Sequence, residues 1–144
     1  MELAAMGRVV VTARIENLDD LFEVSKSQRA EAEVRTISVD DALVDTGATL
    51  LSLPKRLIEQ LGLRQARQRI ARTPAGTMTF NVYFPVRLTV NGRECTTEVC
   101  EVPDACPVLI GQIPLEMLDF LVDPVAQRLI GNPAHGGEQM IELF

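Results

Sequence analysis

Apolar and polar residues alternate most regularly between Thr79 and Val90. Every even position in this segment is apolar and most odd positions are polar, which predicts a long β-strand with two different faces. Pro85 lies inside the segment and cannot donate a ladder hydrogen bond, so it is expected at a sheet edge or a bulge. Asn91-Gly92 follows, and this pair is the strongest short signal for a hairpin. The segment 93–102 is therefore predicted to return as a second strand.

Shorter segments with strand character flank this hairpin. Apolar runs at 42–45 and 50–53 are typical of strands that are buried on both faces. The sequence Pro74-Ala75-Gly76 marks a turn, so 63–71 is predicted to pair with the long strand as a second hairpin with a mobile tip. Asp40-Asp41 is interpreted as a turn, and 108–111 is an apolar run that ends in glycine. Further strands are expected at 8–15, 33–39, 127–130 and 139–144.

Helical signals are fewer. The segment 54–61 is predicted to be a helix, because Leu57, Ile58 and Leu61 share one face and Gly62 provides a stop. A second short helix is expected at 114–121, where it begins with proline. The segment 17–29 is polar and only weakly helical, with Asn17 as its candidate N-cap. Mostly short strands with one or two short helices indicate a compact all-β barrel or sandwich.

Length and composition narrow the class of protein. A chain of 144 residues suits a single domain. Hydrophobic residues make up 47%, but aromatic residues only 4% and Trp is absent, so the core is expected to be aliphatic. A net charge of −6 argues against nucleic-acid binding, which needs a basic face. The densest basic patch contains Arg64, Arg67, Arg69 and Arg72, and it is interpreted as a solvated strand or loop face.

Targeting signals and cysteine usage both favour a cytoplasmic protein. No segment has the ~20 apolar residues of a membrane span, and the N-terminus lacks the basic start and apolar core of a signal peptide. Cys95, Cys100 and Cys106 are odd in number and lack CxxC spacing, which argues against disulfides and structural zinc. We expect buried free thiols in a reducing compartment, with no metal and no cofactor.

The segment ALVDTGATLLSLP, residues 42–54, places Asp45-Thr46-Gly47 between apolar runs. Asp and Gly are common in surface turns, so the tripeptide alone has two interpretations. A surface turn would not normally have such apolar flanks on both sides. An aspartate inside an apolar wall must be paired, hydrogen-bonded or protonated, and such groups are candidates for functional sites.

With these flanks the segment resembles the active-site loop of retroviral-type (retropepsin-like, clan AA) aspartic proteases. Two further features are similar to that family: the apolar pair and glycine at 109–111, followed by a helix, and the candidate hairpin tip at 73–77 between them. The tail from Pro114-Leu115 to Pro133 resembles the single-domain bacterial members. The resemblance covers residues 8–131 and implies a closed, β-barrel-like acid protease fold with one lobe per chain, followed by a C-terminal tail at 132–144.

The resemblance also implies a mechanism and a set of site residues. Asp45 would be the catalytic carboxylate, and because the chain has no internal duplication, the second aspartate would come from an identical subunit in a homodimer. Thr46 would bond the partner's backbone, Gly47 would permit the tight turn, and Thr49 would bond the outer carboxylate oxygen. The remaining implied residues are Ala48 in the active-site loop, Leu109, Ile110 and Gly111 in a supporting loop, and Thr73, Pro74, Ala75, Gly76 and Thr77 in a flap that closes over a peptide.

Two alternatives to an endopeptidase stay open at this point. The same dimeric fold could hold peptides without cutting them, since the flap tip has one glycine instead of a glycine-rich run. An unrelated small β protein could also carry Asp-Thr-Gly as a surface turn. Other chemistry has weaker support: His135 is the only histidine and lies in a loop-like tail that is expected to be exposed. The pairs Asp19-Asp20 and Asp40-Asp41 are interpreted as solvated turns.

Overall fold

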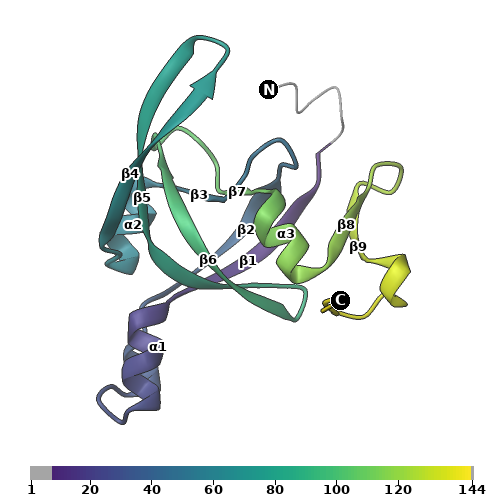
Figure 1. Cartoon of the computed structure of the whole chain (residues 1–144). Coiled ribbons are helices and arrows are strands. Elements are labelled where there is room, and N and C mark those ends of the chain that lie inside the picture. The colour runs from purple at the N-terminus through teal and green to yellow at the C-terminus, as the bar shows by residue number, and fades with distance from the viewer. Residues whose placement is uncertain (1–7, 144) are drawn as a thin grey trace.

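The structure is a computed structural model that describes residues 8–143. It is mostly β, with short helices at the margins of the sheet (Figure 1). The strands are β1 (Val10–Asn17), β2 (Thr36–Val44), β3 (Leu51–Pro54), β4 (Gln65–Thr73), β5 (Gly76–Val90), β6 (Arg93–Val102), β7 (Leu109–Ile110), β8 (Phe120–Asp123) and β9 (Arg128–Gly131). The helices are α1 (Leu18–Ser25), α2 (Lys55–Leu61) and α3 (Gln112–Leu118), with 3₁₀ turns η2 (Glu31–Glu33) and η3 (Pro133–His135).

Seven strands form one sheet that closes on itself. Their order is β1-β2-β7-β3-β6-β5-β4, and β1 also pairs with β5, so six strands form a ring and β4 extends beyond it. Strands β8 and β9 form a separate antiparallel pair. The predicted all-β fold is confirmed. Three α-helices occur within residues 8–143, so the expectation of one or two helices was too low.

The long strand β5 changes partners halfway along its length. Its first half pairs with β4 and its second half with β1, while β6 pairs with parts of both. The β5–β6 register shifts between Tyr83 and Val86, so Pro85 lies at a bulge as predicted. Asn91 and Gly92 both have positive φ, 49° and 79°, which is the geometry that a two-residue hairpin turn requires.

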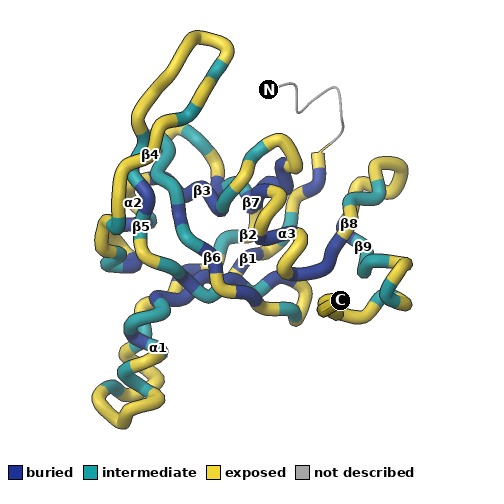
Figure 2. Tube along the Cα trace, viewed as in Figure 1, coloured by how far each residue is buried: buried dark blue, intermediate teal, exposed yellow. Residues whose placement is uncertain are grey.

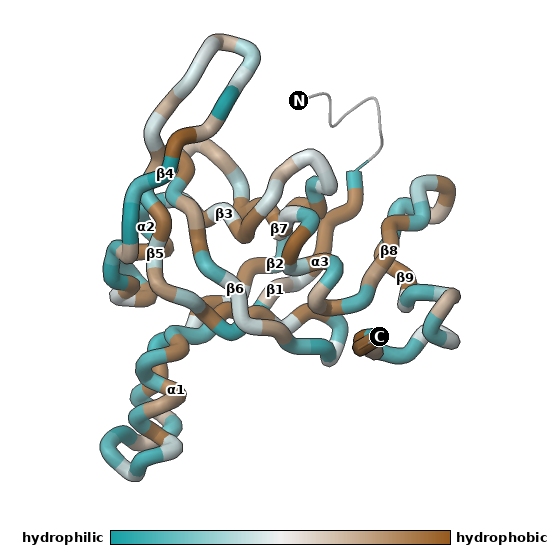
Figure 3. The backbone as a smooth tube through the Cα atoms, viewed as in Figure 1, coloured by the Kyte–Doolittle hydropathy of each residue, from teal (hydrophilic) through white to brown (hydrophobic). Residues whose placement is uncertain are grey.

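The core is aliphatic, as the composition predicts. After the bulge, the even positions of β5 supply Val86, Leu88 and Val90 to this core, all 0–1% exposed. Figure 2 shows buried residues continuing through β3, β7 and part of β6, and Figure 3 shows hydrophobic residues in β3 and β7 and a mixed hydropathy along β6. In contrast, the far end of the β4–β5 hairpin is exposed on both strands.

Helix α1 projects from the ring at the end opposite to the β4–β5 hairpin (Figure 1). The Asn17 side chain accepts a hydrogen bond from the Asp20 N–H, so the predicted N-cap is confirmed. The interpretation of Asp20 as a solvated turn residue was wrong. Its carboxylate is buried and accepts two hydrogen bonds from the Arg35 guanidinium, both at 2.8 Å. The hydrogen bonds from Arg35 lower the pKa of Asp20, which keeps this buried group ionised.

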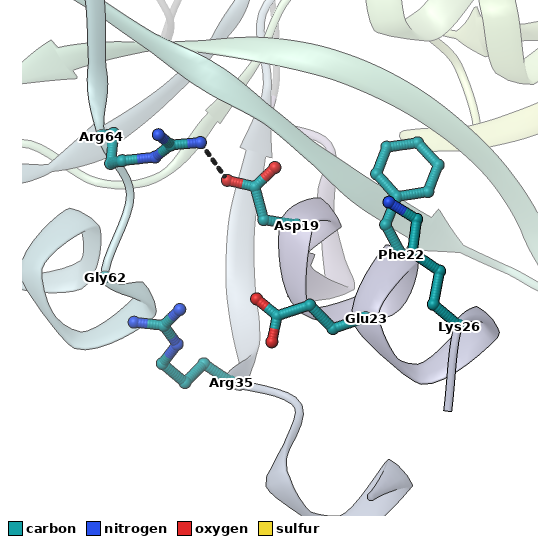
Figure 4. Close-up of a pocket in the computed structure, with 7 residues that line it drawn as sticks. All are labelled: Asp19, Phe22, Glu23, Lys26, Arg35, Gly62 and Arg64. Carbon is teal, nitrogen blue, oxygen red and sulfur yellow. Dashed lines mark hydrogen bonds and ion pairs between the residues drawn. The ribbon is translucent and has the colours of Figure 1, made fainter. Parts of the chain in front are cut away.

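A cavity of about 550 Å³ lies beside α1 and is lined mainly by charged side chains (Figure 4). In this view Arg64 reaches across to Asp19, and the two form an ion pair at 2.8 Å. Arg64 also lies 5.3 Å from the centroid of the Phe84 ring. These contacts tie α1 to Arg64, the residue before β4, and to β5, and we interpret the cavity as part of this structural junction.

Two strand predictions need correction. Asp40-Asp41 is not a turn, because β2 runs through both residues; they lie opposite Thr12, where the β1–β2 register shifts. The bulge needs polar, solvated residues much as a turn does, so the sequence signal was similar. The segment 139–143 forms no strand, and Phe144 lies outside the described residues, as do residues 1–7 of the N-terminal segment. No helix within 8–143 is long and apolar enough to cross a membrane.

His135 attaches the C-terminal segment to the rest of the protein. The expectation that His135 is an exposed loop residue was wrong. Its Nδ1 lies 2.6 Å from the Asp119 carboxylate, and the side chain is only 13% exposed. Asp119 also accepts hydrogen bonds from the Asn132 side chain and the Met140 N–H. On the outer side, His135 Nε2 lies 3.2 Å from Glu142. The hydrogen bond to Asp119 raises the pKa of His135 and lowers the pKa of Asp119.

These pKa shifts predict the pH range in which the contacts of His135 and Asp119 hold the C-terminal segment in place. The stabilising contribution of His135 is complete below its unfolded-state pKa of about 6.5. It is lost as the pH rises through the raised pKa of His135 in the folded state. The contribution of Asp119 is complete above about pH 3.9 and is lost as the pH falls through the lowered value. Amide exchange at Met140, corrected for intrinsic rates, should therefore be slowest between about pH 4 and 6.5. His135→Gln should remove the change on the high-pH side of this profile, and equal profiles in both proteins would contradict the assignment.

Candidate active site

Asp45 directly follows strand β2 and is the central residue of the candidate site. Its backbone N–H donates to the Ile110 carbonyl at 2.9 Å, which continues the pairing of β2 with β7. The residue is 4% exposed. Carboxylate oxygen Oδ1 accepts a hydrogen bond from the Gly47 N–H at 2.9 Å. The other oxygen, Oδ2, is buried and has no hydrogen-bond partner within residues 8–143.

An unpartnered buried carboxylate oxygen is unusual, because burying such a group without a partner is costly. The apolar flanks that drew attention to Asp45 in the sequence are the buried ends of β2 and β3. One oxygen of the carboxyl group is fixed in place by Gly47, and the second is left available. Such a group can exchange a proton or bind a water or a second carboxyl group.

The loop after Asp45 is tight and partly exposed. The Ala48 N–H donates to the Asp45 carbonyl at 3.0 Å, which closes the turn. A Cβ atom at Gly47 would lie 3.2 Å from Asp45 Oδ1, so a side chain there would press on the carboxylate. Thr46, Gly47 and Thr49 are exposed and Ala48 is half-buried. The expected hydrogen bond from Thr49 to the outer carboxylate oxygen is not formed in the single chain, since Oδ2 has no partner.

The segment Leu109-Ile110-Gly111 lies against this loop. Strand β7 pairs with β2 on one side and with β3 on the other. The Gly111 N–H donates to the Leu50 carbonyl at 3.0 Å, and the next two N–H groups, at the start of α3, donate to Ala48 and Thr49. A Cβ atom at Gly111 would lie 2.4 Å from the Leu50 carbonyl oxygen. Glycine is therefore required where the two segments cross.

Strands β4 and β5 form the predicted second hairpin, and its tip contains the residues 73–77. The Thr73 hydroxyl donates to the Gly76 carbonyl at 2.8 Å and accepts from the Ala75 N–H at 3.2 Å. Gly76 has φ +118°, a conformation that favours glycine. Thr73 is half-buried, whereas Pro74, Ala75, Gly76 and Thr77 are exposed. Among the described residues 8–143, no strand other than β4 and β5 pairs at this end of the hairpin (Figure 1).

A cleft of about 710 Å³ separates the Asp45 loop from the hairpin. Its lining comes from the loop residues 47–50, from β3, β4, β5 and β6, and from Ile113 at the start of α3. The hairpin contributes residues below its tip, including Ile70, Met78 and Phe80, while 73–77 do not line the cleft. Ile70, Met78 and Phe80 were not identified from the sequence as part of a cleft wall. Met78 and Phe80 nevertheless occupy even positions of β5, as the aliphatic residues of this strand do.

Polar and acidic groups also line the cleft. Ser52 and Cys100 are neighbours on adjacent strands, and Glu98 forms an ion pair with Arg67 at 2.5 Å. Glu101 accepts a hydrogen bond from Tyr83 at 2.6 Å. Burial and the Glu101 carboxylate raise the pKa of Tyr83 to about 12, so its hydroxyl remains a donor at neutral pH. Within residues 8–143, His, Cys, Asp and Glu do not gather in groups of three that could hold a metal ion.

The order of these parts along the chain can be compared with known families. Residues 30–134 match the family described as aspartyl protease. The chain belongs to the aspartyl protease family. The matched stretch contains the Asp45 loop, the β4–β5 hairpin and the segment 109–111. This match confirms the resemblance that the sequence indicated, and it rules out the alternative of an unrelated β protein.

Membership in the aspartyl protease family supports a general function as an aspartic protease, a hydrolase that acts on peptide or protein substrates. No curated protein matched the chain. The chemistry of this site is consistent with the family, because an aspartyl protease needs a carboxyl group that is held rigidly but keeps one oxygen available for proton transfer.

Proposed function

We propose that the chain, as a single domain over residues 1–144, is an aspartic endopeptidase that acts as a homodimer. Two Asp45 carboxyl groups, one from each subunit, would activate one water molecule for direct attack on a peptide bond. The observation that supports this proposal most strongly is the second oxygen of Asp45, which is buried and unpartnered within residues 8–143. A carboxyl group of an identical subunit supplies the partner that this oxygen lacks.

A single carboxyl group does not suffice for this reaction. One carboxylate must remove a proton from water while a protonated carboxyl group donates one to the carbonyl oxygen of the substrate. Two carboxyl groups at close range do not both ionise, so a symmetric pair shares one proton and provides the acid and the base together. A twofold axis beside Asp45 brings the two groups together by symmetry, because residues at such an axis face their own copies.

The exposed residues beside Asp45 fit a contact across this axis. Thr46 and Gly47 are both exposed although they adjoin a buried aspartate. In the proposed dimer the Thr46 hydroxyl bonds the partner's backbone and holds the two loops together. Leu109, Ile110 and Gly111 support the loop from behind. The proposal therefore makes dimerisation a condition of activity, since neither subunit has two catalytic carboxyl groups.

The cleft is proposed to bind an extended peptide. The backbone of the peptide would add strand-like hydrogen bonds between the active-site loop and the hairpin, and the wall residues would contact its side chains. The tip at 73–77 would close as a flap over the bound peptide and exclude water. The three cysteines at 95, 100 and 106 are free thiols, which supports a location in a reducing compartment such as the cytoplasm.

Dilution tests the requirement for a dimer. Specific activity toward a peptide library should be constant at high protein concentration and should fall once the dimer dissociates. Sedimentation at the same concentrations gives the fraction of dimer, and the two curves should coincide. Constant specific activity in samples that sediment as monomers would contradict the proposal. A dimer that binds peptides but cuts none of them would favour the alternative, a non-catalytic peptide-binding module.

A further inference from the structure

The wall of the cleft contains a polar pair that the proposed mechanism does not use. Ser52 lies in β3 between two fully buried leucines and is itself only 5% exposed. In the parallel pairing of β3 with β6 its partner is Cys100, and the two side chains meet with Oγ 3.0 Å from Sγ. Both residues line the cleft. Leu51 and Leu53 belong to the hydrophobic core, whereas Ser52, between them in the sequence, lines the cleft.

The pair leaves hydrogen-bonding capacity unused. The hydroxyl and the thiol each carry one hydrogen, and either atom can be the donor in their mutual contact. Whichever donates, the other hydrogen and at least one lone pair of the hydroxyl oxygen stay free. Sulfur is also a weak partner for a hydroxyl group, and a buried hydroxyl without a good partner destabilises its surroundings. The pair is therefore prepared to bind a group that both donates and accepts.

We infer that Ser52 and Cys100 form a specificity-determining contact that selects an uncharged hydroxyl or carboxamide side chain, as in Thr, Ser or Asn, at one position of the substrate peptide. This inference rests on the proposed function, because it assumes that a peptide occupies the cleft. It goes further by naming the chemical class of one substrate side chain and the two residues that recognise it.

The charges near the pair argue against a charged side chain as its ligand. The acidic residues that also line the cleft already have partners: Glu98 is paired with Arg67, and Glu101 accepts a hydrogen bond from Tyr83. Burial raises the pKa of the Cys100 thiol, so it is neutral and serves as a weak donor instead of a thiolate. Arg69 and Arg72 of β4 also line the cleft, but the Ser52–Cys100 pair is itself neutral, so a charged peptide side chain placed against this pair would lose hydration without gaining an opposite charge from it.

The test compares peptide pairs that differ only in threonine or valine, which have nearly the same shape. The wild type should cleave the threonine peptide about 3- to 10-fold more efficiently at one position, the range expected for one net hydrogen bond. Ser52→Ala combined with Cys100→Val should remove this preference, so that the ratio of the two cleavage efficiencies falls to about 1. Cys100→Ser, which keeps a polar pair, should retain the preference. Ser25→Ala in α1 is the matched control and should not change it.

The possible results separate this inference from the proposed function. A wild type that cleaves threonine and valine peptides equally at every position would overturn the inference alone. A preference that survives in the double variant, with an unchanged thermal midpoint, would do the same. A wild type that cleaves nothing but binds the threonine peptide more tightly in titrations would refute the protease proposal and support the inference. A protein that neither cleaves nor binds peptides would overturn both.

Discussion

Replacing Asp45 with asparagine should abolish peptide cleavage and leave the fold and the dimer intact. Asparagine has nearly the same shape, and its carbonyl oxygen can still accept the hydrogen bond that Gly47 donates to Oδ1 at 2.9 Å. The amide cannot exchange a proton with water or with the substrate. Because acid–base catalysis typically contributes about 10²- to 10⁴-fold, and both subunits lose their carboxyl group, we expect a loss of at least about 10³-fold in kcat/KM.

Asp41→Asn is the matched control for this experiment. Asp41 lies four positions earlier, on β2, is exposed, belongs to the β1–β2 bulge and does not line the cleft. The same chemical change there should leave cleavage unaltered. Sedimentation and thermal unfolding of both variants show whether the dimer and the fold persist. Substantial activity in Asp45→Asn would mean that Asp45 is not the catalytic residue.

Among the substitutions that add a single methyl group near the site, Gly111→Ala should destabilise the protein most. The new Cβ would lie 2.4 Å from the Leu50 carbonyl oxygen, 2.7 Å from the Thr49 carbonyl carbon and 2.8 Å from that of Ala48. All three are backbone atoms, so no side-chain rotation relieves the contact. Overpacking of this kind costs about 3 kcal/mol or more in the free energy of unfolding. The shifted loop also carries Asp45, so activity should fall with stability.

The control for this substitution is Gly136→Ala. Gly136 has φ +65°, and a Cβ there has no atom within 4 Å, so the only cost is backbone strain of about 1 kcal/mol. Chemical denaturation of both variants measures the difference. If the Gly111→Ala variant is no less stable than the Gly136→Ala variant, the supporting segment and the active-site loop do not cross as closely as in this structure.

The sequence predicted those features of the fold that depend on local pattern. The β5–β6 hairpin followed from strict alternation and from Asn91-Gly92, and the bulge at Pro85 followed from its missing N–H. Periodicity shows which side chains share a face, but it does not show which strand lies beside another. The closure of the ring by β1 and β5 joins residues about 70 positions apart, and no local signal contains that information.

Other features were missed because side chains paired across long separations. Asp20 looked like a solvated residue, since its partner Arg35 lies 15 positions away and only the fold brings the two together. Phe120 and Leu121, the first two residues of β8, were assigned to the helix predicted at 114–121, because the apolar residues continue to Leu121. Helix α3 in fact ends at Leu118, and its C-cap Asp119 adopts φ +60°, where glycine would have been an obvious stop signal.

The Asp45 site was predictable to the level of its loop, and its cleft was not. An acidic residue between apolar runs signalled a buried carboxylate, and the structure places it at 4% exposure. The wall residues of the cleft come from several strands that are far apart in the sequence. The contact between Ser52 and Cys100 depends on the parallel register of β3 and β6, which is set by tertiary packing alone.

Strand β4 ends the seven-stranded sheet, and pairs only with β5 within residues 8–143. The backbone N–H and C=O groups along its outer edge could form hydrogen bonds with a strand of another molecule. Arg67, Arg69 and Arg72 all lie on this strand, and a second copy approaching it edge to edge would meet the same positive charges. The arginines that looked like an ordinary solvated face are thus expected to disfavour edge-to-edge pairing between two copies of this hairpin.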